Sequence, residues 1–228
     1  MTMPFYVPPE QLIKDRADFA KKGIARGRPI IITEFFHGVL LIGENPSGSL
    51  HKLGEIYDSI AFAGVGRFNE FETMRVAGIR YADLKGYAYG RADVTAKGLA
   101  NVYSQTLGQI FTHEVKPYEV GIFVVEIGEE PSDTRLFRIQ FDGTLITEQG
   151  FGAIGGEEEA LRDRLSDDFD ASRALSDAVT YATKAIEEIE DRDIVATDWE
   201  AAVLDQSLGR RCFRRLDARE IEIARTPS

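Results

Sequence analysis

Cysteine, histidine and long apolar runs are scarce in this sequence, and each scarcity excludes a class of protein. The single cysteine, Cys212, cannot form an intrachain disulfide and is typical of a reducing compartment. The three histidines, His37, His51 and His113, lack the spacing of metal ligands, so no metal site is expected. No apolar run reaches the ~20 residues of a membrane span, and residues 1–9 do not resemble a signal peptide. A cytoplasmic location is therefore expected.

Positive charge is also in short supply. The 228 residues contain 27 Lys and Arg against 38 Asp and Glu, which gives a formal net charge of −11. Nucleic acids require a basic face and anionic membranes require basic clusters, so neither partner is expected. The length and the apolar content of 43% suit one soluble domain with a sizeable core.

Several glycine-rich or serine-rich pieces lack the rest of the motif that would make them chemical sites. Gly64-Val65-Gly66 has no third glycine for a dinucleotide site. The run from Gly150 to Gly156 has no following Lys-Ser or Lys-Thr for a phosphate loop. Ser47-Gly48-Ser49 lacks the flanking glycines of a serine hydrolase motif. We expect tight turns at the two glycine runs, and no cofactor.

Apolar periodicity divides the chain into helices and strands. The 3.6-residue period predicts helices over residues 10–22, 68–81, 95–112 and 171–189, and another that begins near residue 157. Apolar, β-rich runs predict strands over residues 30–33, 39–42, 60–63, 120–127, 136–141, 145–146, 199–205 and 212–216. Residues 86–90 are expected to form a loop and residues 150–156 an approach to a helix, and no element is assigned after residue 216.

The order of these elements indicates an α+β fold. Successive strands come in pairs joined by turns, which favours antiparallel sheets over a doubly wound parallel sheet. Each sheet must bury one face on the other sheet and one face on helices. We therefore expect a four-layer αββα sandwich of two antiparallel sheets.

The stretch from Gly38 to Arg75 carries the most specific signal. It contains the strand-like run Gly38–Pro46, a polar hairpin with Lys52, and the run Gly64–Phe71, which leads into a helix. This order is similar to the start of the Ntn-hydrolase domain of proteasome subunits. Matching blocks continue along the chain, at residues 10–11, 22–26, 44–46, 68–71, 86–89, 99–103, 105–108, 116–120 and 202–205. The chain as a whole resembles the α subunit of the proteasome core particle, of the actinobacterial type.

This resemblance implies a subunit without catalytic residues. Hydrolytic relatives attack with a threonine whose free α-amine lies at the head of the first strand. Here that position falls near Arg28 and Pro29, inside the chain. Glu44 and Lys52 nevertheless occupy the places of the acid and the lysine that assist the threonine. The implied role is therefore structural and gating, within a complex whose peptidase activity belongs to its β subunits.

Lys52 has two interpretations. As an ordinary surface lysine it would make a weak ion pair, worth less than ~1 kcal/mol. The resemblance instead implies a pocket between neighbouring subunits, in which Lys52 receives the C-terminal carboxylate of a ring ATPase or another activator. Gly66 and Arg67 match a further wall of that pocket, and Gly23 lies beside it; these four are called the docking residues below. The implied partners are other copies of the chain in a heptameric ring, β subunits and the activator.

The resemblance also implies an N-terminal gate, ahead of a single domain over residues 10–228. The gate residues would be Met1, Thr2, Met3, Pro4, Phe5, Tyr6, Val7, Pro8 and Pro9. Their apolar side chains would converge on the ring axis and occlude the pore. Archaeal and eukaryotic relatives carry a Tyr-Asp-Arg sequence here that this chain lacks, so their gate geometry does not transfer. Two other functions stay open: an active Ntn-type peptidase with a displaced nucleophile, and a stand-alone binding module of unrelated fold.

Overall fold

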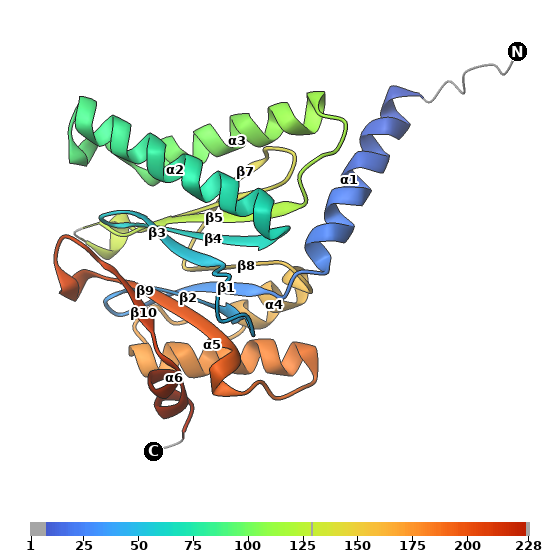
Figure 1. Cartoon of the computed structure of the whole chain (residues 1–228). Coiled ribbons are helices and arrows are strands. Elements are labelled where there is room, and N and C mark those ends of the chain that lie inside the picture. Colours follow the sequence, from blue (N-terminus) through green and yellow to red (C-terminus); the bar gives the residue numbers. More distant parts are fainter. Residues whose placement is uncertain (1–7, 129, 227–228) are drawn as a thin grey trace, which may run out of the picture.

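Two five-stranded sheets lie face to face between layers of helices in the computed structural model, which describes residues 8–128 and 130–226 (Figure 1). The strand order is β10-β9-β2-β1-β8 in the first sheet and β3-β4-β5-β6-β7 in the second. Every described strand pair is antiparallel. The predicted αββα sandwich is therefore confirmed. The predicted gate residues 1–7 lie outside the described residues.

The first sheet contains β1 (Ile30–Phe35), β2 (Gly38–Glu44), β8 (Phe151–Ile154), β9 (Trp199–Asp205) and β10 (Phe213–Leu216). The second sheet contains β3 (Leu53–Tyr57), β4 (Ile60–Gly66), β5 (Val120–Glu126), β6 (Arg135–Ile139) and β7 (Leu145–Glu148). Helices α4 (Glu158–Ser166) and α5 (Leu175–Glu190) cover the first sheet, and α6 (Ala218–Arg225) packs on α5. Helices α2 (Phe68–Ala88) and α3 (Ala96–His113) cover the second sheet.

Successive side chains along the central strands point to opposite faces of their sheet, and together they form three apolar layers. On β1, Ile31 joins the core beneath α5, whereas Ile30 and Ile32 join the layer between the two sheets. On β4, Phe62 lies under α2 and α3, and its neighbour Ala63 faces the first sheet. Successive strand residues point to opposite faces, so strands buried on both faces must be apolar at nearly every position. This is why these strands read as continuous apolar runs in the sequence.

Two predicted boundaries near glycines are wrong. Strand β4 does not end at residue 63 but continues to Gly66, because Gly64 and Gly66 pair with β5. A side chain at Gly64 would come within 2.8 Å of the Phe71 ring, so the glycine permits close packing of α2. Helix α2 extends through most of the predicted loop at residues 86–90, and Gly86 lies against the Tyr57 hydroxyl.

Two strands and one α-helix were not predicted, and another helix begins later than predicted. Strands β3 and β8 and helix α6 are absent from the sequence-based assignment. Helix α6 begins with a capping box, in which Asp217 and Glu220 each accept a hydrogen bond from the backbone N–H of the other. The helix predicted from residue 171 begins at Leu175, because Asp170 accepts two hydrogen bonds from Ser172 and forms a local turn.

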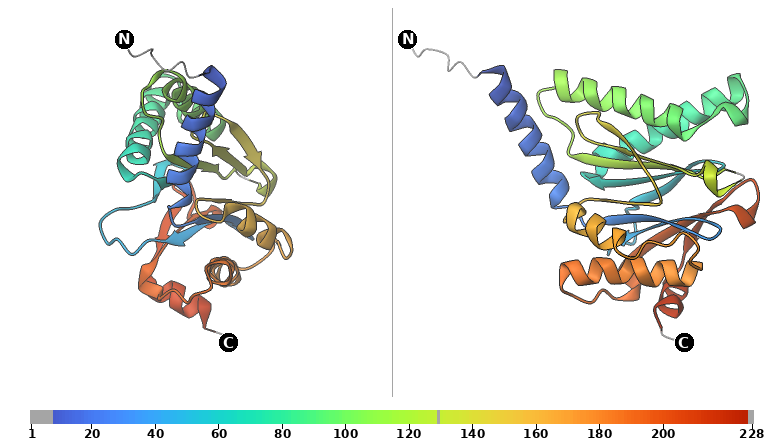
Figure 2. Two further views of the ribbon diagram at one scale, coloured as in Figure 1. Left: turned by 90° about the vertical axis from the view of Figure 1, so that its right-hand side faces the viewer. Right: turned by 180° about the vertical axis from the view of Figure 1, so that it is seen from behind.

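Helix α1 (Pro9–Ala25) stands at one end of the sandwich. Its C-terminal end lies beside β4 and β5, and its N-terminal end points away from the sheets (Figures 1 and 2). Pro9, the last of the predicted gate residues, forms the first turn of this helix. Leu12 and Ile13 are exposed on its surface. None of the helices in the described part of the chain is long and apolar enough to cross a membrane.

Candidate docking site

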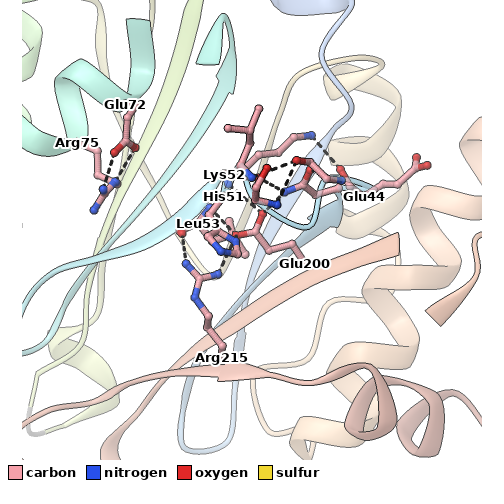
Figure 3. Close-up of polar contacts among 12 residues, drawn as sticks. Glu44, His51, Lys52, Leu53, Glu72, Arg75, Glu200 and Arg215 are labelled. Atoms are coloured by element: carbon pink, nitrogen blue, oxygen red, sulfur yellow. Dashed lines mark hydrogen bonds and ion pairs between the residues drawn. The ribbon is translucent and has the colours of Figure 1, made fainter. Parts of the chain in front are cut away.

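Lys52 lies immediately before β3, next to the end of β2 (Figure 3). Its ammonium group donates hydrogen bonds to the carbonyl oxygens of Glu44, at 2.9 Å, and Arg28, at 3.3 Å. An ammonium has three N–H donors, so a third remains for a ligand. Burial lowers the pKa of Lys52 to about 8, although the nearby Glu200 carboxylate acts in the opposite direction. Lys52 is therefore a half-buried cation held in a fixed position.

The carboxylate of Glu44 is turned away from the Lys52 ammonium toward two arginines. Arg28 and Arg192 both form ion pairs with it, and Arg192 Nη1 lies 3.1 Å from Oε1. Burial raises the pKa of Glu44, but hydrogen bonds and charge from Arg192 and Arg28 outweigh that effect and lower it. The side chains of Glu44 and Lys52 thus form separate contacts. At the predicted nucleophile position, Arg28 presents a backbone carbonyl to Lys52.

Glu200 on β9 fixes the connection that carries Lys52 (Figure 3). Its carboxylate accepts hydrogen bonds from the backbone N–H groups of Lys52, at 2.9 Å, and Leu53, at 3.1 Å. The Asn45 amide, at 2.6 Å, and the Arg215 guanidinium, at 2.8 Å, also donate to it, and His51 Nδ1 lies 3.3 Å from Oε1. Sequence analysis missed this residue. The available signal was an acidic residue inside the otherwise apolar strand run of residues 199–204.

The other docking residues converge on Glu119, which sequence analysis also missed. Gly66 has φ +111°, and a Cβ there would lie 1.8 Å from the Glu119 carbonyl oxygen. Arg67 donates from its backbone N–H to the same carbonyl, at 3.0 Å, and from Nε to the Glu119 carboxylate, at 2.9 Å. A Cβ at Gly23 would lie 2.1 Å from Glu119 Oε2. Gly23 and Arg67 therefore meet the Glu119 carboxylate, and Gly66 meets the backbone carbonyl of the same residue.

The contacts around Lys52 and the contacts around Glu119 lie next to each other at one end of the sandwich. The backbone N–H of Gly64 on β4 donates to the Lys52 carbonyl at 3.0 Å, two residues before Gly66. Gly27, in the segment after α1, packs against Val65 on the same strand. The next residue in that segment, Arg28, supplies the carbonyl that holds the Lys52 ammonium. The segment between α1 and β1 thus connects the surroundings of Lys52 with those of Glu119. The Lys52 side chain and the Arg67 side chain nevertheless have different partners.

Comparisons with known proteins agree with this fold. The model of the family described as "Proteasome subunit" matches residues 38–203. A protein named "Proteasome subunit alpha" from Xylanimonas cellulosilytica is 51% identical over 226 residues, which cover 95% of this chain and 93% of the relative. Proteins of the same name from Thermomonospora curvata, 50% identical over 97% of both chains, and Acidimicrobium ferrooxidans, 52% identical over 98% of this chain and 96% of the relative, are equally similar.

Proposed function

Because this chain belongs to the proteasome subunit family, and its relatives at about half identity are named α subunits, we propose that it is a non-catalytic α subunit of a cytoplasmic proteasome core particle. In this proposal, seven copies form each outer ring and bind a ring of β subunits. The N-terminal segments gate the passage of substrate. The docking residues receive the C-terminal carboxylate of a ring ATPase or another activator.

The fixed Lys52 ammonium carries the docking proposal. Two carbonyl oxygens hold it in place, and its remaining donor suits a ligand carboxylate. The side chains of Arg28 and Arg67 are 42% and 62% exposed and place two more guanidinium groups nearby, paired with Glu44 and Glu119. An incoming chain end would thus meet cationic side chains on a protein whose net charge is negative.

The surroundings of Arg28 support a non-catalytic role. A threonine nucleophile needs its own free amine beside the assisting lysine. At this place the chain continues through Arg28 and Pro29 into β1, and the Lys52 ammonium binds a peptide carbonyl. Glu44, the matching acid, is engaged by two arginines. These groups stabilise the fold around Lys52 and provide neither a nucleophile nor a base.

The position of α1 supports the gate. The helix begins at Pro9, and its N-terminal end points away from the sheets (Figure 1). Its exposed Leu12 and Ile13 offer an apolar surface to a neighbouring copy in the ring. Phe5, Tyr6 and Val7 would then meet their counterparts at the axis.

The proposal is tested on particles assembled from this chain and its host's β subunit. Native mass spectrometry should show four seven-membered rings, with hydrolysis of short peptides lost when the N-terminal threonine of the β subunit is replaced. Deletion of residues 2–7 should speed hydrolysis without activator, and an unchanged rate would refute the gate. Lys52→Ala should abolish stimulation by the activator and leave the unstimulated rate intact, whereas Lys184→Ala, an exposed lysine on α5, should change neither.

The two rival functions give different results in the same preparation. An isolated chain that cleaves peptides would favour an active Ntn-type peptidase. A monomer that neither cleaves peptides nor binds the β subunit would favour a stand-alone binding module.

A further inference from the structure

Helix α1 is fastened to the rest of the molecule along one stripe by the end of α3 and the connection from α3 to β5. The stripe contains Arg16, Phe19 and Gly23, which are spaced three and four residues apart and so share one face of the helix. Each of the three meets a different part of residues 110–119. The remaining contacts of α1 with the sheets are at its C-terminal end, next to β4 and β5.

Arg16 provides the first attachment. Its guanidinium donates to the carbonyl oxygens of Phe111, at 2.5 Å, and Ile110, at 3.3 Å, in the last turn of α3, and reaches the Val115 carbonyl at 3.4 Å. The carbonyl groups in the last turn of a helix carry partial negative charge, so a cation from α1 is favourable there. The Ile110 carbonyl also accepts from the backbone N–H of Glu114. Lys116 provides the second attachment, with its ammonium 5.6 Å from the centre of the Phe19 ring.

Glu119 provides the third attachment and also contacts the docking residues. One carboxylate oxygen, Oε2, packs where Gly23 has no side chain. The other, Oε1, accepts from Arg67 and pairs with Lys116, each at 2.9 Å. The side chain of Glu119 is 10% exposed, and its backbone N–H is held by Glu70 at 2.6 Å. A single buried carboxylate thus touches helix α1 with one oxygen and Arg67 with the other.

We propose that Glu119 is a positioning residue that couples the docking residues to helix α1; this inference rests on the proposed function. A ligand carboxylate that recruits the exposed guanidinium of Arg67 competes with Glu119 for it. The Glu119 carboxylate then holds the C-terminal end of α1 less firmly. The helix has 17 residues, or about 25 Å, so a small rotation near Gly23 becomes a larger displacement at Pro9. Docking therefore favours a displaced gate because the ligand binds that state more tightly.

The test uses particles assembled with the host's β subunit and a fluorescent synthetic peptide that copies the C-terminal residues of the host's ring ATPase. Glu119→Gln keeps the shape of the side chain and removes its charge. Glu114→Gln makes the same change at an exposed position of the same connection and serves as the matched control. Two quantities are measured for each particle: the Kd of the peptide, and the stimulation of hydrolysis of a short substrate at saturating peptide.

If Glu119 couples docking to helix α1, then Glu119→Gln should separate the affinity for the peptide from the stimulation of hydrolysis. Glu119→Gln should bind the peptide within about twofold of wild type, because Lys52 is intact, yet lose about fivefold or more of the maximal stimulation. Glu114→Gln should match wild type in both measurements. Hydrogen exchange of the α1 amides should rise on peptide binding in wild type and in Glu114→Gln, and should be indifferent to the peptide in Glu119→Gln.

Two results would overturn the coupling. One is undiminished stimulation in Glu119→Gln; the other is a parallel loss of peptide affinity and stimulation, which indicates a merely structural role. Failure of the docking proposal itself is distinguishable, since Lys52→Ala would then keep its stimulation. If Glu119→Gln particles do not assemble, Gly23→Ala tests the same contact, because its methyl group displaces the carboxylate. It should reproduce the separation of affinity from stimulation, and normal stimulation in this variant would equally refute the coupling.

Discussion

Docking of an activator carboxylate at Lys52 is expected to weaken steeply above pH 8. Burial lowers the pKa of this lysine from 10.5 to about 8. Among the charges around it, Glu200, Glu44 and Glu190 raise the pKa and Arg28 lowers it. Only the protonated amine attracts a carboxylate, so full affinity is present below the pKa and is lost as the pH rises through it.

The size of the effect follows from the fraction of Lys52 that is charged. With a pKa of about 8, this fraction is ~0.9 at pH 7 and ~0.1 at pH 9, so the affinity should fall about tenfold across this interval. An exposed lysine, whose pKa stays near 10.4, would lose only about 4% of its charged form by pH 9. A strong dependence in this range therefore reports the buried position of the amine.

Fluorescence anisotropy of an N-acetylated activator peptide with a free C-terminal carboxylate measures this affinity directly. Such a peptide, chosen without His, Cys, Lys or Tyr, does not itself titrate between about pH 6.5 and 9.5. Lys52→Arg is the matched control, because a guanidinium stays protonated and should bind with little dependence on pH. An affinity that is constant between pH 7 and 9, or that falls equally in Lys52→Arg, would refute the reasoning.

Two further predictions concern the framework of the site. Gly66→Ala should destabilise the isolated chain by about 3 kcal/mol or more, because φ is +111° and the new methyl group would lie 1.8 Å from the Glu119 carbonyl oxygen. Thermal unfolding measures this, with Gly48→Ala, whose Cβ meets nothing within 4 Å, as the control; equal stability of both variants would contradict it. Glu200→Gln should move the midpoint of the pH dependence at Lys52 to lower pH, since it removes a carboxylate that raises the lysine pKa. An unmoved midpoint in the anisotropy titration would show that Glu200 does not act on the amine.

Helices and strands were predictable where burial imposes a period on the sequence. Strand β5 is apolar over almost its whole length because both of its faces are buried, and α3 shows the 3.6-residue period of a helix that covers a sheet. Strand β3 was missed because its five residues include Gly54 and Glu55, and only pairing with β4 makes them a strand. Tertiary pairing likewise overrode the glycines that were expected to end β4.

The candidate site was likewise predictable from the sequence only in part. The sequence supplied Lys52, Gly66, Arg67 and Gly23 through blocks of local similarity, but nothing in it says what each side chain touches. Glu200 lies 148 residues from Lys52, and its role depends on β9 lying beside β2. Glu44 stands eight residues before Lys52, yet its carboxylate pairs with Arg192 instead.

The sequence by itself determined the layers of this protein and the family to which it belongs, and it supplied the residues proposed for docking, because burial and local motifs act between near neighbours in the chain. Only the tertiary structure decided that Gly23 and Arg67 meet at Glu119, 52 residues beyond Arg67. Helix α1, the end of β4 and the start of β5 come together only when β4 pairs with β5 in the second sheet and α1 packs beside both strands. A carboxylate contact between such distant segments has no local signature, since ion pairs form between any residues that folding brings within a few ångströms.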